Sequence, residues 1–287
     1  MKKTNLAIAL ILLLFCAFTI RRFALTTAIP QQPPQDVQRV IDADLVAGAN
    51  LDLAGRGEQA RVYLAKSIQH AETPEAKIVR IRALAMSYAF ESNCQKTIEY
   101  EQQAFDGYAA LHNFYQQGEA ADEAARVCLD SGDFDAAAKW YKIGHDVGLQ
   151  DPDLTPATRN LWEFRWEHAQ ARIAARRGNT KEAQKHVAAA KSIFDKGAIP
   201  LQAPFFPYLA AYVAFYAGDF NSALEQFSKA NQKDPFILCM IAQTYEKLGK
   251  PAEAKEFYRK ASATTAHNPP AAYAVPFSRK RLAVLKL

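Results

Sequence analysis

Histidines and carboxylates are the side chains of this 287-residue chain that acid–base or metal chemistry would use. No histidine is followed four residues later by another across a glutamate, which is the spacing that zinc hydrolases place on one helix face. Phosphate-binding loops, dinucleotide-binding glycine patterns and nucleophile elbows are also absent, and nothing marks two carboxylates for joint action. The sequence therefore predicts no enzymatic activity, no metal site and no cofactor.

Thiol chemistry is the next candidate. Cys16 lies in the N-terminal region, and Cys94, Cys128 and Cys239 follow it. Three is an odd number, and no two of these residues are close in the sequence, so we predict no disulfide framework. We expect the three cysteines to fill the core as small apolar side chains.

Amphipathic helices are the elements that would position any binding residue. The stretch from Gly218 to Pro235 begins with a Gly-Asp turn and ends at a proline. Its apolar residues are spaced by three and four and share one helix face; they are Phe220, Ala223, Phe227 and Ala230. The alanines let a neighbouring helix come close, and the phenylalanines fill the space beside them. Such a helix cannot bury its apolar face alone and needs similar helices on both sides.

This stretch resembles the second half of a tetratricopeptide repeat, a helix–turn–helix unit of about 34 residues. The same size pattern fits five further windows, residues 41–74, 78–111, 118–151, 164–197 and 235–268. The helix at 205–217 departs from it, because Pro207 replaces the usual large residue. The small position of each second helix is held in turn by Ala60, Thr97, Ala137, Ala183, Ala223 and Ala254. The resemblance implies an all-α, right-handed superhelical solenoid of about six repeats over residues 39–268.

A concave groove is what the resemblance implies for binding, because the first helix of each repeat lines it in that family. The inward positions of the third repeat are Glu119, Asp122, Arg126 and Leu129. We select as partner-binding residues two arginines of the fourth repeat and four aromatic residues of the fifth, since both types form binding hot spots; they are Arg165, Arg172, Phe205, Tyr208, Tyr212 and Phe215.

The expected ligand of this groove is a peptide or protein segment of apolar and acidic character. The alternative is that the rings pack between neighbouring helices or under the C-terminal segment. The lysine and asparagine set of the family members that bind chaperone tails is not found at these positions.

Three aromatic residues cluster near the start of the fourth repeat. Trp162 and Trp166 are four residues apart and share a helix face, with Phe164 between them. We expect them to form core between the third and fourth repeats, and an exposed partner contact is the alternative.

The first 28 residues have the features of an export signal typical of bacteria. Lys2 and Lys3 precede an apolar run at residues 6–20, which is followed by Arg21 and Arg22. Either residues 1–28 are cleaved near Ala28, or they remain as a membrane anchor. We therefore expect a periplasmic or other extracytoplasmic protein, secreted or anchored to the inner membrane. A Pro/Gln-rich linker follows at residues 29–38.

The net charge of +5 gives no reason to expect a nucleic-acid partner. The four basic residues that flank the apolar run account for most of it and leave about +1 for the remainder. Membrane contact is expected only through the N-terminal segment, if that segment is not cleaved.

The C-terminal residues 269–287 leave the repeat pattern, and an amphipathic helix is expected from Phe277. The ends of a solenoid need a cap, and we assign this role to the segment; a basic membrane-surface helix is the alternative. The sequence as a whole predicts a non-catalytic scaffold that binds a protein or peptide partner. The alternative function is a regulatory module that senses a ligand or a peptide.

Overall fold

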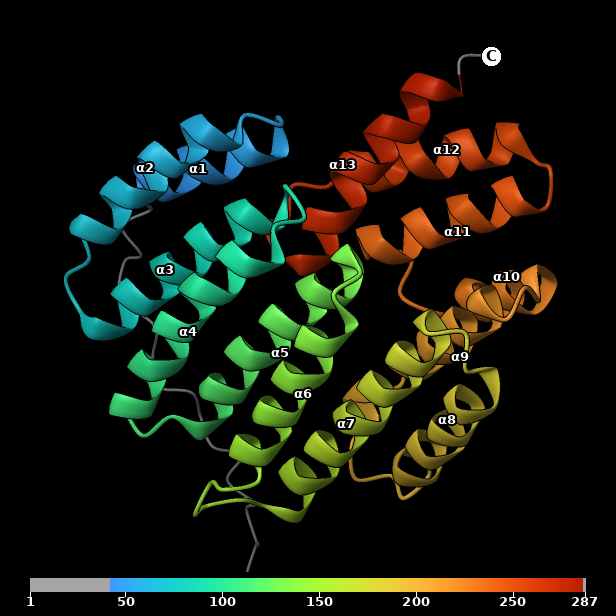
Figure 1. Ribbon diagram of the computed structural model, residues 1–287, viewed down its shortest axis with the longest axis horizontal. Coiled ribbons are helices and arrows are strands. Elements are labelled where there is room, and N and C mark those ends of the chain that lie inside the picture. The colour runs from blue at the N-terminus through green and yellow to red at the C-terminus, as the bar shows by residue number, and fades with distance from the viewer. Residues whose placement is uncertain (1–41, 286–287) are drawn as a thin grey trace, which may run out of the picture. The chain divides into compact units, whose positions relative to one another are not determined.

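The described part of this protein is built from helices that pair with their neighbours in the chain. A computed structural model describes residues 42–285, and this part contains thirteen α-helices, one short 3-10 helix and no strand (Figure 1). The first helices are α1 (Ala43–Leu53), α2 (Gly57–Gln69), α3 (Pro74–Ala89), α4 (Cys94–Ala110), α5 (Phe114–Ser131) and α6 (Phe134–Gly148). The others are α7 (Pro156–Arg176), α8 (Thr180–Phe194), η1 (Pro200–Gln202), α9 (Phe205–Tyr216), α10 (Phe220–Lys229), α11 (Pro235–Lys247), α12 (Pro251–Ser262) and α13 (Pro269–Val284).

The expected signal or anchor at residues 1–28 and the expected linker at residues 29–38 lie outside the described residues.

Helix pairs stack in chain order. Every α-helix contacts the next one, from α1 with α2 to α12 with α13. Contacts that skip one helix join first helices of successive pairs, such as α1 with α3 and α7 with α9. Figure 1 shows the pairs α3–α4, α5–α6 and α7–α8 side by side. This arrangement of neighbouring units is a solenoid, and it confirms the predicted all-α fold of six helix pairs with an additional C-terminal helix.

Glycine turns followed by capping residues separate the two helices of several pairs. Gly218 has a φ of 84°, in the left-handed region that glycine adopts without strain. Asp219 then caps α10 by accepting a hydrogen bond from the N–H of Ser222 at 3.1 Å. The long helix expected after Thr155 is present as α7, and the Thr155 hydroxyl accepts from the N–H of Thr158 at 3.1 Å.

Small side chains occupy the most buried positions of the second helices. All six residues at the predicted small position have an exposed fraction of 0%; they are Ala60, Thr97, Ala137, Ala183, Ala223 and Ala254. Phe227 and Tyr258, each four residues beyond one of these alanines, are buried to the same extent. A methyl group leaves room for the neighbouring helix, and the rings fill the remaining space at interior packing density. Burying one such ring contributes about 2–3 kcal/mol.

Trp162 lies against two glycines of the preceding pair. Its side chain is buried, and a Cβ atom added at Gly118 of α5 would lie 2.5 Å from the ring. A Cβ atom added at Gly148 of α6 would come closer still to the same ring. Phe164 is also buried, and Trp166 is partly buried beside the ring of His145 at 5.1 Å. The expected core between the third and fourth pairs is therefore formed by Trp162 and Trp166, whereas Phe164 packs into the cluster of the fourth and fifth pairs, with the Phe194 ring 6.5 Å away.

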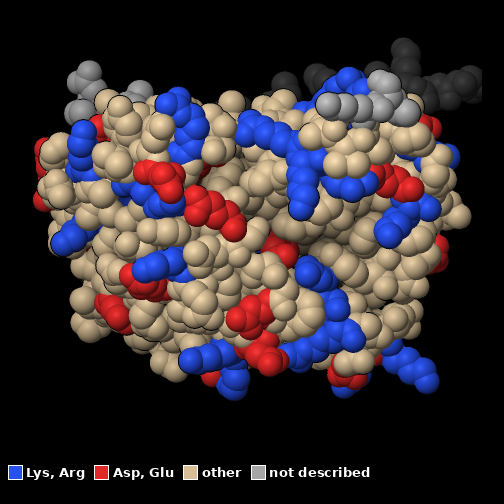
Figure 2. All heavy atoms as spheres, turned by 45° about the horizontal axis from the view of Figure 1, so that its top comes forward, with Lys and Arg blue, Asp and Glu red and all other residues tan. Residues whose placement is uncertain are grey.

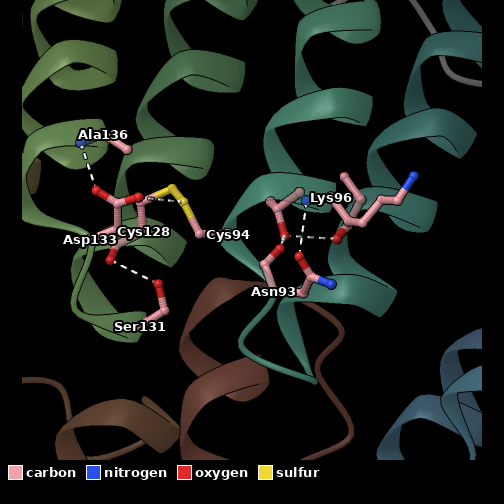
Figure 3. The surroundings of a disulfide bond; sticks show 9 residues. Asn93, Cys94, Lys96, Cys128, Ser131, Asp133 and Ala136 are labelled. Carbon is pink, nitrogen blue, oxygen red and sulfur yellow. Dashed lines mark hydrogen bonds between the residues drawn. A yellow bond between two sulfur atoms is a disulfide. The ribbon is translucent and has the colours of Figure 1, made fainter.

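A disulfide joins Cys94, the first residue of α4, to Cys128 of α5 (Figure 3). The prediction of no disulfide was wrong, because residues 34 apart are far in sequence but adjacent when one repeat stacks on the next. Their Cα atoms are 4.8 Å apart. Cys239 is a free buried cysteine, as expected, and burial raises the pKa of its thiol to about 12.

The C-terminal helix reaches back to the first half of the chain. It begins at Pro269, eight residues before the expected start, and it contacts α3 and α5 as well as α11 and α12. Just before it, Nε2 of His267 lies 2.8 Å from the buried carboxylate of Asp52, which also accepts from the hydroxyl of Ser87 at 2.7 Å. The His267 ring stacks on Phe90 at 5.3 Å. These contacts hold the segment before α13 against α1 and α3.

Reduction of the Cys94–Cys128 disulfide is expected to lower the free energy of unfolding. Chain-entropy arguments for a closed loop of 34 residues give a loss of about 3–4 kcal/mol. Urea unfolding of the full-length protein with and without dithiothreitol measures it. The Cys94→Ala/Cys128→Ala variant is the control and should not respond to the reductant. Equal stability of the reduced and oxidised wild type, with reduction verified by thiol counting, would contradict the prediction.

Gly148→Ala is expected to destabilise the fold by about 1–3 kcal/mol, because the added methyl overlaps the Trp162 ring in a closely packed site. The same substitution made in a Trp162→Ala background should cost less, since the ring is gone. Denaturant unfolding of the two single variants and the double variant tests this coupling. Strictly additive effects would show that the ring and the glycine do not interact.

Candidate binding groove on the inner face

Two cavities lie on the face formed by the first helices of the pairs, which we call the inner face. The apolar cavity has a volume of about 290 Å³, and its apolar wall is formed by Leu45, Ala49, Val79, Ala83 and Met86. The arginine cavity has a volume of about 340 Å³ and is lined by Arg126, Arg165 and Arg172, among others. Glu123, Asn268 and Pro269 line both. The cavities are therefore neighbours, and the turn before α13 lies between them.

Helical spacing explains the composition of the arginine cavity. Helix α5 contributes Glu119 and, three, four and seven residues after it, Asp122, Glu123 and Arg126. At these spacings the four side chains share one helix face. Helix α7 contributes Arg165 and Arg172, seven residues apart, from the next pair. Stacking of successive pairs thus brings carboxylates and guanidinium groups of two helices together.

Arg165 is held by carboxylates of the neighbouring pair. Its guanidinium donates to Glu119, lies 4.0 Å from Asp122, and sits 4.9 Å over the Trp162 ring. Burial raises the pKa of Asp122 to about 7, although the positive charge of Arg165 acts in the opposite direction. Arg165 therefore lines the cavity, and carboxylates of α5 already balance its positive charge.

Arg172 and Arg126 are bound differently. The Arg172 side chain is 6% exposed, and one of its terminal nitrogens donates to the hydroxyl of Tyr141 at 2.7 Å. The Arg126 guanidinium lies 4.8 Å over the ring of Phe236, and its Nε is 3.9 Å from Asp130. Within residues 42–285, neither Nε–H has a hydrogen-bond acceptor.

A fourth arginine ties the apolar cavity to the same helices. Arg82 of α3 pairs with Glu123 of α5 at 2.8 Å and lies 3.8 Å from Glu101 of α4. Glu101 is fully buried, and burial followed by the charge of Glu123 raises the pKa of Glu101 well above its usual value. Arg82 thus lies between two carboxylates, and its closer contact is the one with Glu123.

The structure separates the six residues selected from the sequence. Arg165 and Arg172 line the arginine cavity together with Phe205, whose side chain is 44% exposed. The expectation that the other rings lie open was wrong, since Tyr208, Tyr212 and Phe215 are buried. Tyr208 and Tyr212 pack against the ring of Phe236 at 5.9 and 6.4 Å. On the other side, Phe236 contacts Tyr273 of α13 at 5.0 Å.

The composition of α9 carried the signal for this burial. Its sequence Phe-Phe-Pro-Tyr-Leu-Ala-Ala-Tyr-Val-Ala-Phe-Tyr has apolar or aromatic residues on every side, which is typical of a helix surrounded by protein. The lining that was not selected from the sequence includes Arg126 and the turn at residues 268–270, as well as the whole apolar cavity. Arg126 stood at an inward position, but nothing in the sequence showed that α13 would fold back beside it.

Positively and negatively charged side chains are interspersed on the face of the molecule that Figure 2 shows. Several lysines pair with a carboxylate one helical turn away, such as Lys191 with Asp195 at 2.6 Å and Lys229 with Glu225 at 2.7 Å. Exposed pairs of this kind contribute little to stability. The arginines of the inner face, which are buried or partly buried, therefore stand apart from the ordinary surface charges.

Residues 42–285 contain neither a candidate membrane span nor a candidate metal site. No helix in this range has both the length and the apolar character needed to cross a membrane. No group of three or more His, Cys, Asp or Glu side chains in the same range is arranged to hold a metal ion.

Stacked helix pairs with small residues at their contacts define a helical repeat protein. The model of the tetratricopeptide repeat family matches residues 237–263, which cover most of α11 and α12. The chain thus contains a tetratricopeptide repeat, and its helix pairs form a solenoid of the tetratricopeptide type. Proteins built from these repeats are generally non-catalytic scaffolds for protein–protein interaction.

Comparison with whole proteins adds little to this assignment. No curated protein matches the sequence. Among solved structures, the chain is similar to a tetratricopeptide repeat protein from Parabacteroides merdae, with 11% identity and a TM-score of 0.40. The match covers 86% of this chain and 99% of that chain.

Asp122→Asn is expected to change how stability depends on pH. The folded-state pKa of about 7 lies above the ordinary value of 3.8, so this group favours folding fully below pH 4. That contribution is lost as the pH rises from about 4 through 7. Relative to Asp122→Asn, the wild type should therefore lose about 2–3 kcal/mol between pH 5 and pH 8. Urea unfolding across this range measures the difference, and parallel pH profiles would contradict the assignment.

Proposed function

We propose that this protein is a non-catalytic scaffold that binds an extended segment of a partner protein along its inner face. The segment has apolar residues for the apolar cavity and an acidic residue for the arginine cavity. The observation that carries the proposal is the adjacency of the two cavities, which share Glu123, Asn268 and Pro269. A ligand that fills both must extend past the turn between them, as a peptide segment does.

Exposed apolar side chains at both cavities support this proposal. Val79 at the apolar cavity is 52% exposed, and Phe205 at the arginine cavity is 44% exposed. Aromatic and arginine side chains at a cavity wall are frequent hot spots of binding. Arg165 is fixed by Glu119 and Trp162, so this part of the wall needs little reordering when a partner binds.

We also propose that the protein works outside the cytoplasm, either secreted or anchored to the inner membrane by residues 6–20. The charged and apolar leader of the sequence motivates this proposal. The disulfide between Cys94 and Cys128 supports it, because disulfides form and persist in oxidising compartments.

Photo-crosslinking in the native cell envelope tests the scaffold function. A photoreactive amino acid placed at Val79 or Phe205 should capture the same partner protein. The same amino acid at Lys185, an exposed residue of α8 outside both cavities, is the control and should not capture it.

Binding of the purified partner then tests which side chains matter. The Val79→Ser/Phe205→Ser variant should bind about tenfold or more weakly, because it removes two exposed apolar contacts. Lys185→Ala should bind as the wild type does. Unchanged affinity of the double variant, with its thermal unfolding also unchanged, would place the partner elsewhere.

A further inference from the structure

Positive charge exceeds negative charge at the inner end of the arginine cavity. Arg126 and Arg172 both lie there, and Asp130 is a carboxylate whose charge acts on both. Burial raises the pKa of Asp130 in spite of these arginines. The carboxylates across the cavity are engaged elsewhere, since Glu119 and Asp122 face Arg165 and Glu123 pairs with Arg82. The two inner guanidinium groups therefore share one carboxylate, Asp130, which lies 3.9 Å from Nε of Arg126 and can balance only one of the two positive charges.

The ring of His168 reports the same excess. It is buried between Phe164 and Tyr208, with ring centroids 5.9 and 5.3 Å away. Burial lowers the pKa of His168 well below its usual value, and the positive charges of Arg172 and Arg126 lower it further. A neutral histidine beside two arginines is what a site of positive potential produces.

Unpaired donors sit in this region. The Nε–H groups of Arg126 and Arg172 are shielded from solvent and have no acceptor within the described chain. Burying a charged donor without an acceptor costs more than burying a neutral one. Folded proteins satisfy the large majority of buried polar groups, so a remaining pair of donors at a cavity wall calls for an acceptor from outside.

We propose that the inner end of the arginine cavity is an oxyanion site, where Arg126 and Arg172 together bind one carboxylate or phosphate group beside the turn at Asn268. Guanidinium groups suit such ligands because their planar donors match two oxygens of one group. The cavity of about 340 Å³ exceeds the roughly 30 Å³ occupied by one water many times. It therefore accommodates an acidic side chain or a small acid as well as inorganic phosphate.

The oxyanion bound at this site is either an acidic residue of the partner segment or a free small anion. Only the first of these sources rests on the proposed function. The first experiment needs no partner. Full-length protein is titrated with sodium phosphate or sodium succinate, with sodium chloride at equal ionic strength as reference, and thermal unfolding is followed. Either oxyanion should raise the melting temperature above the chloride reference.

Matched variants locate the site. Arg172→Met and Arg126→Met should each weaken oxyanion binding about tenfold or more, as the loss of a charge-assisted contact predicts. Arg177→Met is the control, because Arg177 follows α7 on the surface and pairs with Asp135. Oxyanion binding that survives in both cavity variants, or that is lost equally in Arg177→Met, would overturn the proposal.

A measurement on the wild type keeps the test independent of variant folding. The Nε–H signals of buried arginines in an NMR spectrum should shift when phosphate or succinate is added and not when chloride is added. If phosphate and succinate neither shift these signals nor raise the melting temperature more than chloride does, the inference is wrong.

Partner binding by Arg172→Met identifies the source. Loss of both partner and oxyanion binding assigns the group to an acidic residue of the partner. Loss of oxyanion binding alone assigns it to a free anion. If the wild type binds the oxyanion but captures no partner at Val79 or Phe205, the oxyanion site stands and the scaffold function fails.

Discussion

The close approach of helices at small side chains is the constraint on which the rest of this structure depends. Every second helix of a pair has a fully buried small residue, of which Ala223 and Thr97 are examples. A larger side chain there would separate the helices and leave voids beside rings such as Phe227. Because the pairs stack at this spacing, residues seven apart on α5 and α7 come to face one cavity. The small residues on the second helices thus set the spacing of the pairs, and this spacing decides which side chains of the first helices meet on the inner face.

Buried charge on the inner face is arranged across repeats. Arg82 joins α3 to Glu123 of α5, and Arg165 joins α7 to Glu119 of α5, so α5 is the helix on which both pairings converge. In each pair, the attraction between the two charges offsets part of the free energy that their removal from water costs. Burial, and then the charge of Glu123, raise the pKa of Glu101 well above its usual value, so its charged form is disfavoured there. Arg126 and Arg172 share Asp130, and the Nε–H of each has no hydrogen-bond acceptor within the described residues, which sets them apart from the arginines that have carboxylates of their own.

Repetition made the fold predictable from the sequence, and contacts between distant repeats made parts of the site unpredictable. The spacing of Ala223 and Phe227 is local information, and it recurs often enough to specify helix pairs. Cys94 and Cys128 are neighbours only after two repeats have stacked, so counting cysteines could not pair them. The aromatic residues of α9 were assigned to an open groove because the position within a repeat was considered without the surrounding helices. Tyr208 and Tyr212 are instead covered by α11, and α13 packs behind it.

The C-terminal segment makes the groove a property of both ends of the chain. The stack of first helices supplies one wall, and the turn at Asn268 and Pro269 supplies another wall of both cavities. That turn is fixed by His267, which binds Asp52 across 215 residues of sequence. Since one turn borders the two cavities, any ligand that displaces it from one of them also reshapes the other.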